Sequence, residues 1–311
     1  MVYEDYLKSN SPRMQKSATG LSKRQFLLLG SSFEKVYHEI QNERLKSGEI
    51  RKLPKGGAYT QLDEPRKMLF FVLVYLKNYC TLDFIGLIFG FSSGHAHDHL
   101  MRLLPILQRT LSSLEVLPKR TLATVEDLKQ LVEKFGEIIA DGVECPCVKP
   151  GEEVAQKAHY SGKKKRHTVK SLIISNSERR ILLVYFVIAG SVHDYKLFKQ
   201  LFDPKIEWFK DVAIHLDLGF FGANSDYGPN ARLPHKRQRK SKKNLNPRLS
   251  KKQVKSNSEH ARFRVSVEHA IGGMKTFHCL MHRIRNHLPT LIDSFFWLSA
   301  GLWNFKITNK S

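Results

Sequence analysis

The spacing of apolar residues changes near residue 136, and this change restricts the fold more than any other feature of the chain. Upstream, apolar residues recur every three or four positions, for example in 21–40 and 63–79, which is the period of a helix. Downstream, short runs rich in isoleucine and valine predict a meander of strands. These runs span 137–144, 167–175 and 181–188. We therefore expect a helical region followed by an α/β domain with a mixed sheet.

The chain is strongly basic, with 51 lysines and arginines against 29 aspartates and glutamates and a formal net charge of +22. Such a surplus favours polyanionic partners, of which nucleic acid is the most common. Residues 1–20 are polar, lack an apolar leader and are expected to be loose. The apolar segment 288–307 contains polar residues that a bilayer would exclude, so we expect it to be a buried helix. Double-stranded DNA is the expected partner, and no membrane.

Residues 1–120 are expected to form a helical DNA-binding region. Within it, 81–104 predicts two short helices around the turn at Gly90, with Thr81 as the cap of the first. This is the pattern of a helix-turn-helix, whose second helix would face the groove of DNA. The side chains expected to contact DNA are Ser93, His95, His97 and Arg102. A helical hairpin used only for packing would give the same pattern.

A connecting helix is expected at 121–136, and the α/β domain at 137–311. The domain contains the basic segment 232–262, which has twelve lysines and arginines and a single acidic residue, Glu259. Because like charges repel, we expect this segment to be a loop that is mobile until it meets DNA phosphates. Its candidate DNA contacts are Lys240, Lys242, Lys243, Lys251 and Lys252.

Three carboxylates stand out in the α/β domain. Asp141 lies within an apolar strand run, Asp217 closes the predicted strand 212–217, and Glu268 lies in a helical stretch. A carboxylate buried alone costs several kcal/mol, so it requires a partner or a metal ion. Oxygen ligands suit Mg²⁺ or Mn²⁺, and two such ions can promote phosphodiester cleavage. For each acid taken alone, a structural cap or ion pair is the better explanation, and only the three together favour a metal site.

Two cations flank Glu268 at helical spacing. Arg264 precedes it by four residues and Lys275 follows it by seven, so all three are expected on one helix face. This arrangement suits phosphate binding beside a metal, and a structural ladder of ion pairs explains it as well. Cys145 and Cys147 are separated by one residue, which does not match the usual spacing of a zinc knuckle.

Five stretches resemble the DDE transposases of bacterial insertion sequences, in the insertion-sequence family five branch, which is similar to the eukaryotic Harbinger transposases. They are DGVECP at 141–146, YSGKKKRHTVKSLIIS at 160–175, AGSVHDYKLF at 189–198, LDLGFFG at 216–222 and RVSVEHAIGGMK at 264–275. The resemblance implies a ribonuclease H-like catalytic domain. It also implies that the first aspartate lies on the first strand, the second on the fourth strand, and the glutamate on a later helix.

By this resemblance, Asp141, Asp217 and Glu268 are the catalytic metal ligands, with two Mg²⁺ or Mn²⁺ ions expected. A family motif of tyrosine, arginine, glutamate and lysine is matched by Arg264, Glu268 and Lys275, whereas Ala261 occupies the tyrosine position. Asp194 is the rival for second ligand because it lies in a well-marked family stretch. Its place at the start of a helical segment also suits a helix N-terminus, so we expect an accessory role.

The resemblance implies a transposase that cuts DNA at transposon ends and joins the freed 3′ hydroxyl to target DNA, as a homodimer or higher oligomer on DNA in the bacterial cytoplasm and nucleoid. A catalytically silent DNA-binding protein and a nuclease without strand transfer remain alternatives. A basic run expected near the catalytic edge would contact the DNA backbone, unless it is only a solvated turn. It consists of Lys163, Lys164, Lys165 and Arg166.

Overall fold

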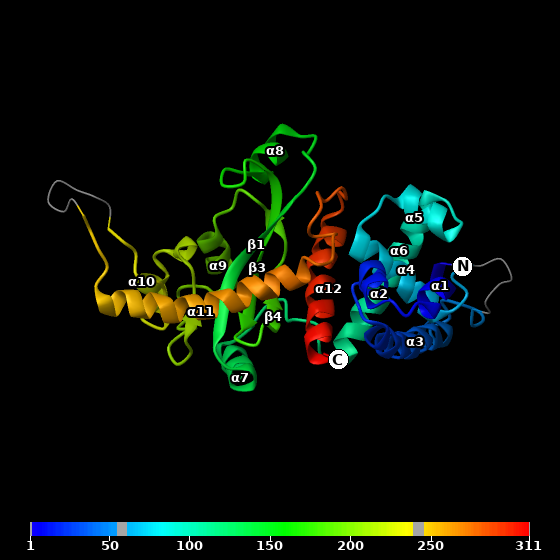
Figure 1. The fold of residues 1–311 in the computed structure, drawn as a ribbon, viewed down its shortest axis with the longest axis horizontal. Coiled ribbons are helices and arrows are strands. Elements are labelled where there is room, and N and C mark those ends of the chain that lie inside the picture. Colours follow the sequence, from blue (N-terminus) through cyan, green and yellow to red (C-terminus); the bar gives the residue numbers. More distant parts are fainter. Residues whose placement is uncertain (1, 55–60, 239–245, 311) are drawn as a thin grey trace. The chain divides into compact units, whose positions relative to one another are not determined.

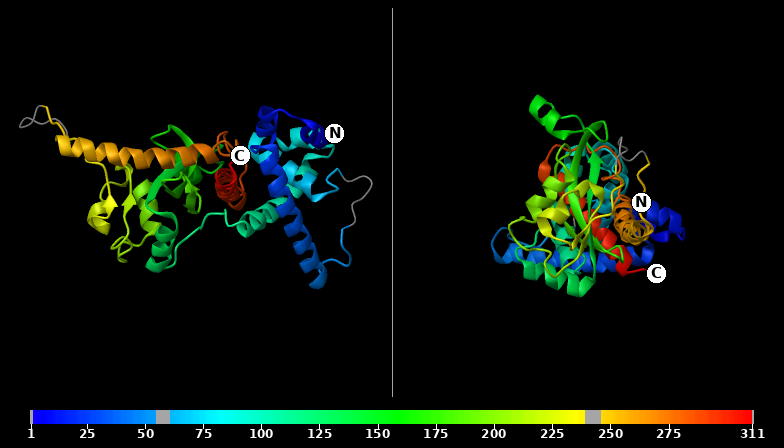
Figure 2. Two further views of the ribbon diagram at one scale, coloured as in Figure 1. Left: turned by 60° about the horizontal axis from the view of Figure 1, so that its bottom comes forward. Right: turned by 90° about the vertical axis from the view of Figure 1, so that its left-hand side faces the viewer.

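The computed structural model describes residues 2–54, 61–238 and 246–310 and divides into two compact units (Figures 1 and 2). The first unit is helical and combines Met1–Leu117 with Met274–Ser311. The second is an α/β unit that spans Pro118–Gly273. The sequence assigned 274–311 to the α/β domain, whereas these residues pack with the helical unit.

The helical unit is built from seven α-helices within its described residues. They are α1 (Val2–Lys8), α2 (Pro12–Thr19), α3 (Lys23–Lys46), α4 (Pro65–Asn78), α5 (Leu82–Phe89), α6 (Ser93–Ser113) and α12 (Pro289–Thr308). The expectation that residues 1–20 are loose is wrong, since they form α1 and α2. Tyr6 is fully buried with its ring 5.0 Å from Phe26, and Ser11 caps α2 by accepting a bond from the amide of Met14. Burial and capping together offset the cost of ordering this segment.

The predicted helix pair at 81–104 is present as α5 and α6. Thr81 and Ser92 cap the two helices, and Gly90 adopts a left-handed conformation between them (φ +76°). Helix α6 continues nine residues past Leu104, through Pro105 to Ser113. Proline removes only one backbone hydrogen bond here, and the buried stripe of apolar residues that follows it keeps the helix in place. That stripe contains Ile106, Leu107 and Leu111.

Helix α12 is the buried helix predicted at 288–307. Phe295 and Phe296 are fully buried, and the Asn304 amide donates a hydrogen bond to the carbonyl of Val116 (2.9 Å). Its large apolar surface is covered by other helices of the helical unit, which explains why this C-terminal segment packs there. Among the residues described, no helix has both the length and the apolar character needed to cross a bilayer.

The α/β unit is organised around a mixed seven-stranded sheet. The strands are β1 (Ile138–Pro146), β2 (Tyr160–Ser161), β3 (Arg166–Asn176), β4 (Ile181–Val184), β5 (Ile188–Ala189), β6 (Ile214–His215) and β7 (Ala231–Arg232). The order is β2-β3-β1-β6-β7, with β4 and β5 also paired to β3. Pairing is antiparallel between β1 and β3 and between β3 and β4, so the predicted meander is confirmed. Strands β6 and β7 run parallel to β1.

Helices cover both faces of this sheet. The helices of the α/β unit are α7 (Val125–Phe135), α9 (Asp194–Leu201), α10 (Ala223–Tyr227) and α11 (Lys251–Met274), with a short 3₁₀ helix, η1 (Leu218–Phe220), and α8 (Glu153–His159), which lies beyond the ends of β1 and β3. Figures 1 and 2 show α11 on one face and α9 with α10 on the other. Phe198 of α9 packs on Phe209 and Phe220 in the main core. This α/β fold, preceded by an all-α region, confirms the expected ribonuclease H-like fold class.

Helix α11 begins at Lys251, ten residues before the predicted start at Ala261. The expectation of one mobile basic loop at 232–262 is therefore wrong for its last third. Ser250 and Gln253 form a reciprocal cap, in which each side chain accepts a hydrogen bond from the backbone amide of the other (2.9 and 3.2 Å). Lys252 stays exposed on this helix, where solvent screens its charge.

Candidate active site

Asp141 and Asp217 occupy equivalent positions along two neighbouring parallel chain segments: Asp141 lies within β1, and Asp217 lies two residues beyond the end of β6, which is shorter than the predicted strand 212–217. Ile139 of β1 is paired with His215 of β6, and each aspartate lies two residues beyond its member of this pair. Adjacent strands are about 4.8 Å apart, so the two carboxylates lie side by side at one edge of the sheet. The structure thus brings together the first two residues that the sequence selected as metal ligands.

The environment of Asp141 is unfavourable for its negative charge. Burial, and next the neighbouring charge of Asp217, raise its pKa from 3.8 to about 6, and Asp194 adds to this effect. The Gly142 amide, which donates to Asp141 Oδ1 at 2.7 Å, and the Arg264 guanidinium act in the opposite direction. A desolvated pair of repelling carboxylates fits a hard divalent cation, which would supply the missing positive charge.

The raised pKa of Asp141 predicts a pH dependence in metal-free protein. As the pH falls, the folded state binds this proton before the unfolded chain does. The contribution of Asp141 to the free energy of unfolding should therefore decrease as the pH rises from about 4 to about 6. Urea denaturation at both ends of this range should show that the free energy of unfolding of Asp141→Asn, relative to that of the wild type, is higher at about pH 6 than at about pH 4. A difference between the two proteins that stays constant with pH would contradict the assignment.

Asp217 is held in position by its own turn. Its Oδ1 accepts a hydrogen bond from the amide of Gly219 (2.7 Å), so the carboxylate caps η1. Gly219 has no side chain, and a Cβ there would lie 2.8 Å from the same oxygen. The LDLGFFG stretch therefore fixes one carboxylate oxygen and leaves the other available for a ligand.

Glu268 lies on α11 in an ion pair with Arg264 (Nε to Oε1, 3.0 Å), and both side chains are half exposed. The flanking residues Val267 and Ala270 are buried and fix the orientation of this helix face. Within the described ranges, no three Asp, Glu, His or Cys side chains are grouped to hold a metal ion. Lys275 lies one residue beyond the end of α11, so it is not part of the helix that carries Glu268.

Asp194 begins α9 and lies against the backbone beside Asp141. Its carboxylate forms an ion pair with Lys170 (2.9 Å), and a Cβ at Gly142 would come within 2.9 Å of Oδ1. The Lys170 ammonium is buried and also donates to the carbonyl of Val192 (2.9 Å). Lys170 was not among the residues predicted from the sequence. A lysine inside the apolar run of β3 was the available signal, because a buried ammonium requires a partner.

The proposed DNA-contacting residues of α6 lie on its solvent side. His95 and Arg102 are exposed, and Ser93 and His97 are half buried. Arg102 Nη2 lies 3.1 Å from Nδ1 of His99. On the opposite side of α6, Ala96, Leu100 and Leu103 are buried. The helix therefore presents a polar face at its N-terminal half.

The basic run 163–166 lies at the end of a projecting arm, which is formed by the ends of β1 and β3 near Pro146 and Thr168 together with α8. Strands β1 and β3 remain paired as far as Pro146 and Thr168, and α8 lies beyond them (Figure 1). All four basic side chains are exposed, the three lysines in the turn before β3 and Arg166 at its first residue. Asp141 is five residues before Pro146, which is about 17 Å along the strand. The expectation that this run lies near the catalytic edge is therefore wrong, because the arm carries it away.

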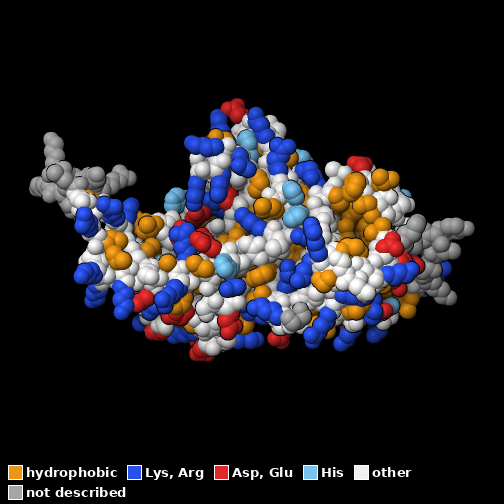
Figure 3. Space-filling view, in the orientation of Figure 1, with side chains coloured by type: hydrophobic (Ala, Val, Ile, Leu, Met, Phe, Trp, Pro, Cys, Tyr) orange, Lys and Arg blue, Asp and Glu red, His pale blue; other side chains and the backbone are white. Residues whose placement is uncertain are grey.

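The remaining candidate DNA contacts fall in and before α11. Lys251 and Lys252 lie in its first turn and are exposed. Lys240, Lys242 and Lys243 are outside the described residues. Lysine and arginine side chains are numerous on the face shown in Figure 3. Solvated cations are thus available over a wide surface for contacts with a polyanion.

Comparison with known proteins identifies both parts of the chain. A family model described as "DDE superfamily endonuclease" matches residues 140–304, and one described as "Helix-turn-helix of DDE superfamily endonuclease" matches 60–113. A protein of Microchaete diplosiphon, the "Probable transposase for insertion sequence element IS702", is 26% identical over 268 residues, which cover 86% of this chain and 89% of that protein. No solved structure matches significantly.

Proposed function

The chain belongs to the DDE superfamily endonuclease family and carries the helix-turn-helix of that family, and we propose on this basis that it is a DNA transposase. It would bind transposon ends, cut DNA with the help of Mg²⁺ or Mn²⁺, and join the cut end to target DNA. The observation that carries the proposal is the alignment of Asp141 with Asp217 on neighbouring strands. We also propose that it belongs to the insertion-sequence family five branch and acts as a dimer or higher oligomer on DNA.

In this proposal, Asp141, Asp217 and Glu268 hold the metal ions. When bound, two ions would activate water and stabilise the leaving oxygen of the phosphodiester. Glu268 has to exchange its partner Arg264 for metal, and the released guanidinium can then bind a phosphate oxygen. Asp194 is neutralised by Lys170, so it supports Asp141 and is not our choice for a primary ligand.

Cutting and joining are tested separately on duplexes that carry the ends of the transposon. An uncut end in Mn²⁺ reports cleavage, and a pre-cut end with a free 3′ hydroxyl, mixed with a supercoiled plasmid, reports strand transfer. We expect both products, and neither in EDTA. Cleavage without joining would indicate a nuclease, and binding without either product a catalytically silent DNA-binding protein.

The exposed side of α6 predicts sequence-specific contacts. Because side chains that contact bases specify the site, His95→Ala and Arg102→Ala should each weaken binding to transposon ends by about tenfold, with a smaller loss on random DNA. Gln108→Ala, on the same helix but outside the proposed contact surface, is the matched control. Competition binding with both DNAs measures the ratio of affinities. An equal loss on the two DNAs would argue against a recognition helix.

A further inference from the structure

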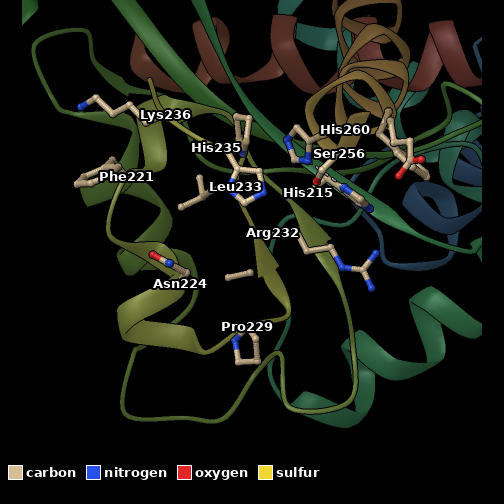
Figure 4. A pocket seen from close by; sticks show the side chains of 14 residues that line it. His215, Phe221, Asn224, Pro229, Arg232, Leu233, His235, Lys236, Ser256 and His260 are labelled. Atoms are coloured by element: carbon tan, nitrogen blue, oxygen red, sulfur yellow. Dashed lines mark hydrogen bonds between the residues drawn. The ribbon is translucent and has the colours of Figure 1, made fainter. Parts of the chain in front are cut away.

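A pocket of about 620 Å³ opens in the α/β unit beside the strand that carries Asp217 (Figure 4). Its volume is in the range of pockets that bind small organic molecules. Side chains from β6, β7, α10, α11 and the loops between them line it. They include His215, Phe221, Asn224, His235, Lys236 and His260. The metal chemistry proposed above uses none of them.

The pocket and the carboxylate site share a wall. His215 lies two residues before Asp217, and Phe221 lies four residues after it. His260 of α11 is hydrogen bonded through Nε2 to the carbonyl of Leu216 (2.8 Å). A ligand in the pocket would therefore lie close to a phosphodiester bound at Asp217.

The inner wall is rigid and polar. The ring of His215 is stacked on Phe263 with 4.2 Å between centroids, and its Nδ1 lies 3.3 Å from Nδ1 of His260. In the loop after β7, the backbone of His235 is fixed by two hydrogen bonds with the Asn257 side chain. The His235 amide donates to Asn257 Oδ1 (2.7 Å), and Asn257 Nδ2 donates to the His235 carbonyl (3.0 Å).

The opposite side of the pocket carries an aromatic ring, an amide and a cation. Phe221 is 63% exposed, although a phenyl ring is usually buried, and the Lys236 ammonium lies 4.7 Å from its centroid. Asn224 is exposed and offers both hydrogen-bond donors and an acceptor. Figure 4 shows Phe221 and Asn224 on one side and His215 and His260 on the other. Arg232 is paired with Glu137 (3.4 Å), so the inner lining is not an anion site.

We propose that this pocket receives one unpaired nucleobase of a DNA strand held at the carboxylate site. An exposed ring stacks on any base, an amide reads the polar edge of a base, and a nearby lysine contacts the adjoining phosphate. The inference rests on the proposed function, since it requires DNA at Asp141 and Asp217.

Two duplexes of 25 base pairs test the pocket in Ca²⁺, a hard cation that carboxylates bind and that takes the place of Mn²⁺ in this binding assay. They are identical except that a central 2-aminopurine lies opposite thymine or opposite guanine. A pocket that accepts an extrahelical base binds the mismatched duplex more tightly, by about tenfold, because less energy is needed to unpair that base. The fluorescence of 2-aminopurine should rise on binding, since the base leaves the stack. Phe221→Ala should abolish the rise and reduce the preference to less than about twofold, and Asn224→Ala should reduce it partly.

Phe186→Ala is the matched control, because Phe186 is also an exposed ring beside a cation (Arg120, 4.5 Å) in the same unit. This variant should behave like the wild type. Equal affinity of the wild type for the two duplexes, or an unchanged preference for the mismatched duplex in Phe221→Ala, would show that the pocket does not bind an unpaired base. Cleavage of the same duplexes in Mn²⁺ is measured in parallel. If the wild type cleaves DNA but does not prefer the mismatched duplex, the base-binding role of the pocket is refuted and the proposed nuclease activity stands. If it prefers the mismatched duplex but does not cleave DNA, the nuclease activity is refuted and the base-binding role is supported.

Discussion

Asp217→Asn should reduce metal-dependent DNA cleavage by about a thousandfold, which corresponds to about 4 kcal/mol of transition-state stabilisation. Asparagine keeps the oxygen that accepts the hydrogen bond from Gly219, so η1 should remain capped. The variant loses the charge that a metal ion requires. Single-turnover cleavage of an end-labelled duplex in Mn²⁺ measures the effect.

DNA affinity and thermal stability provide the internal check on this variant. Both should stay close to those of the wild type, because Asp217 repels Asp141 in metal-free protein and its neutralisation relieves that repulsion. Glu178→Gln, an exposed residue in the turn before β4, is the matched charge-loss control and should cleave normally. If Asp217→Asn cleaves DNA at more than a tenth of the wild-type rate, Asp217 is not a ligand of the catalytic metal ions.

Lys170→Met should lower the free energy of unfolding by about 3 kcal/mol, because removal of one member of a buried ion pair leaves the other without compensation. Lys170 is 7% exposed and holds both Asp194 and the Val192 carbonyl. Urea denaturation measures the loss. Adding Asp194→Leu should restore part of it, since no unpaired charge then remains.

The matched control for this prediction is Lys164→Met, which removes an exposed lysine from the turn before the same strand. A surface substitution of this kind should change stability by less than about 0.5 kcal/mol. A loss below about 1 kcal/mol for Lys170→Met would mean that solvent reaches the pair, and that the pair does little to position Asp194.

Periodicity alone predicted the order of the main elements, because a helix face and a strand each repeat over a few residues. It failed where long-range packing decides the outcome. Helix α1 depends on Tyr6 meeting Phe26, twenty residues away, and the packing of α12 in the helical unit depends on partners such as Val116. Neither contact leaves a local pattern in the sequence. The early start of α11 could have been predicted, since Ser250 and Gln253 have the spacing of a capping box.

The candidate site was only partly accessible from the sequence. The apolar strand runs indicated Asp141 and Asp217, but their adjacency follows from the pairing of β1 with β6, which links segments more than seventy residues apart. The pair of Arg264 with Glu268 could be anticipated from helical spacing. The partnership of Lys170 with Asp194 could not be, because it requires knowledge of how α9 crosses the sheet.

The uninterrupted ladder between β1 and β3 also limits how this protein can vary. It runs without a bulge from Ile138 to Pro146, so Asp141 and the base of the arm share one register. An insertion of one residue in β1 after Asp141 would turn every following side chain to the other face of the sheet. Relatives with longer or shorter arms should therefore differ by two residues in each strand, or about 7 Å of reach per step. Arm length would then change in discrete increments while the carboxylate edge stays fixed.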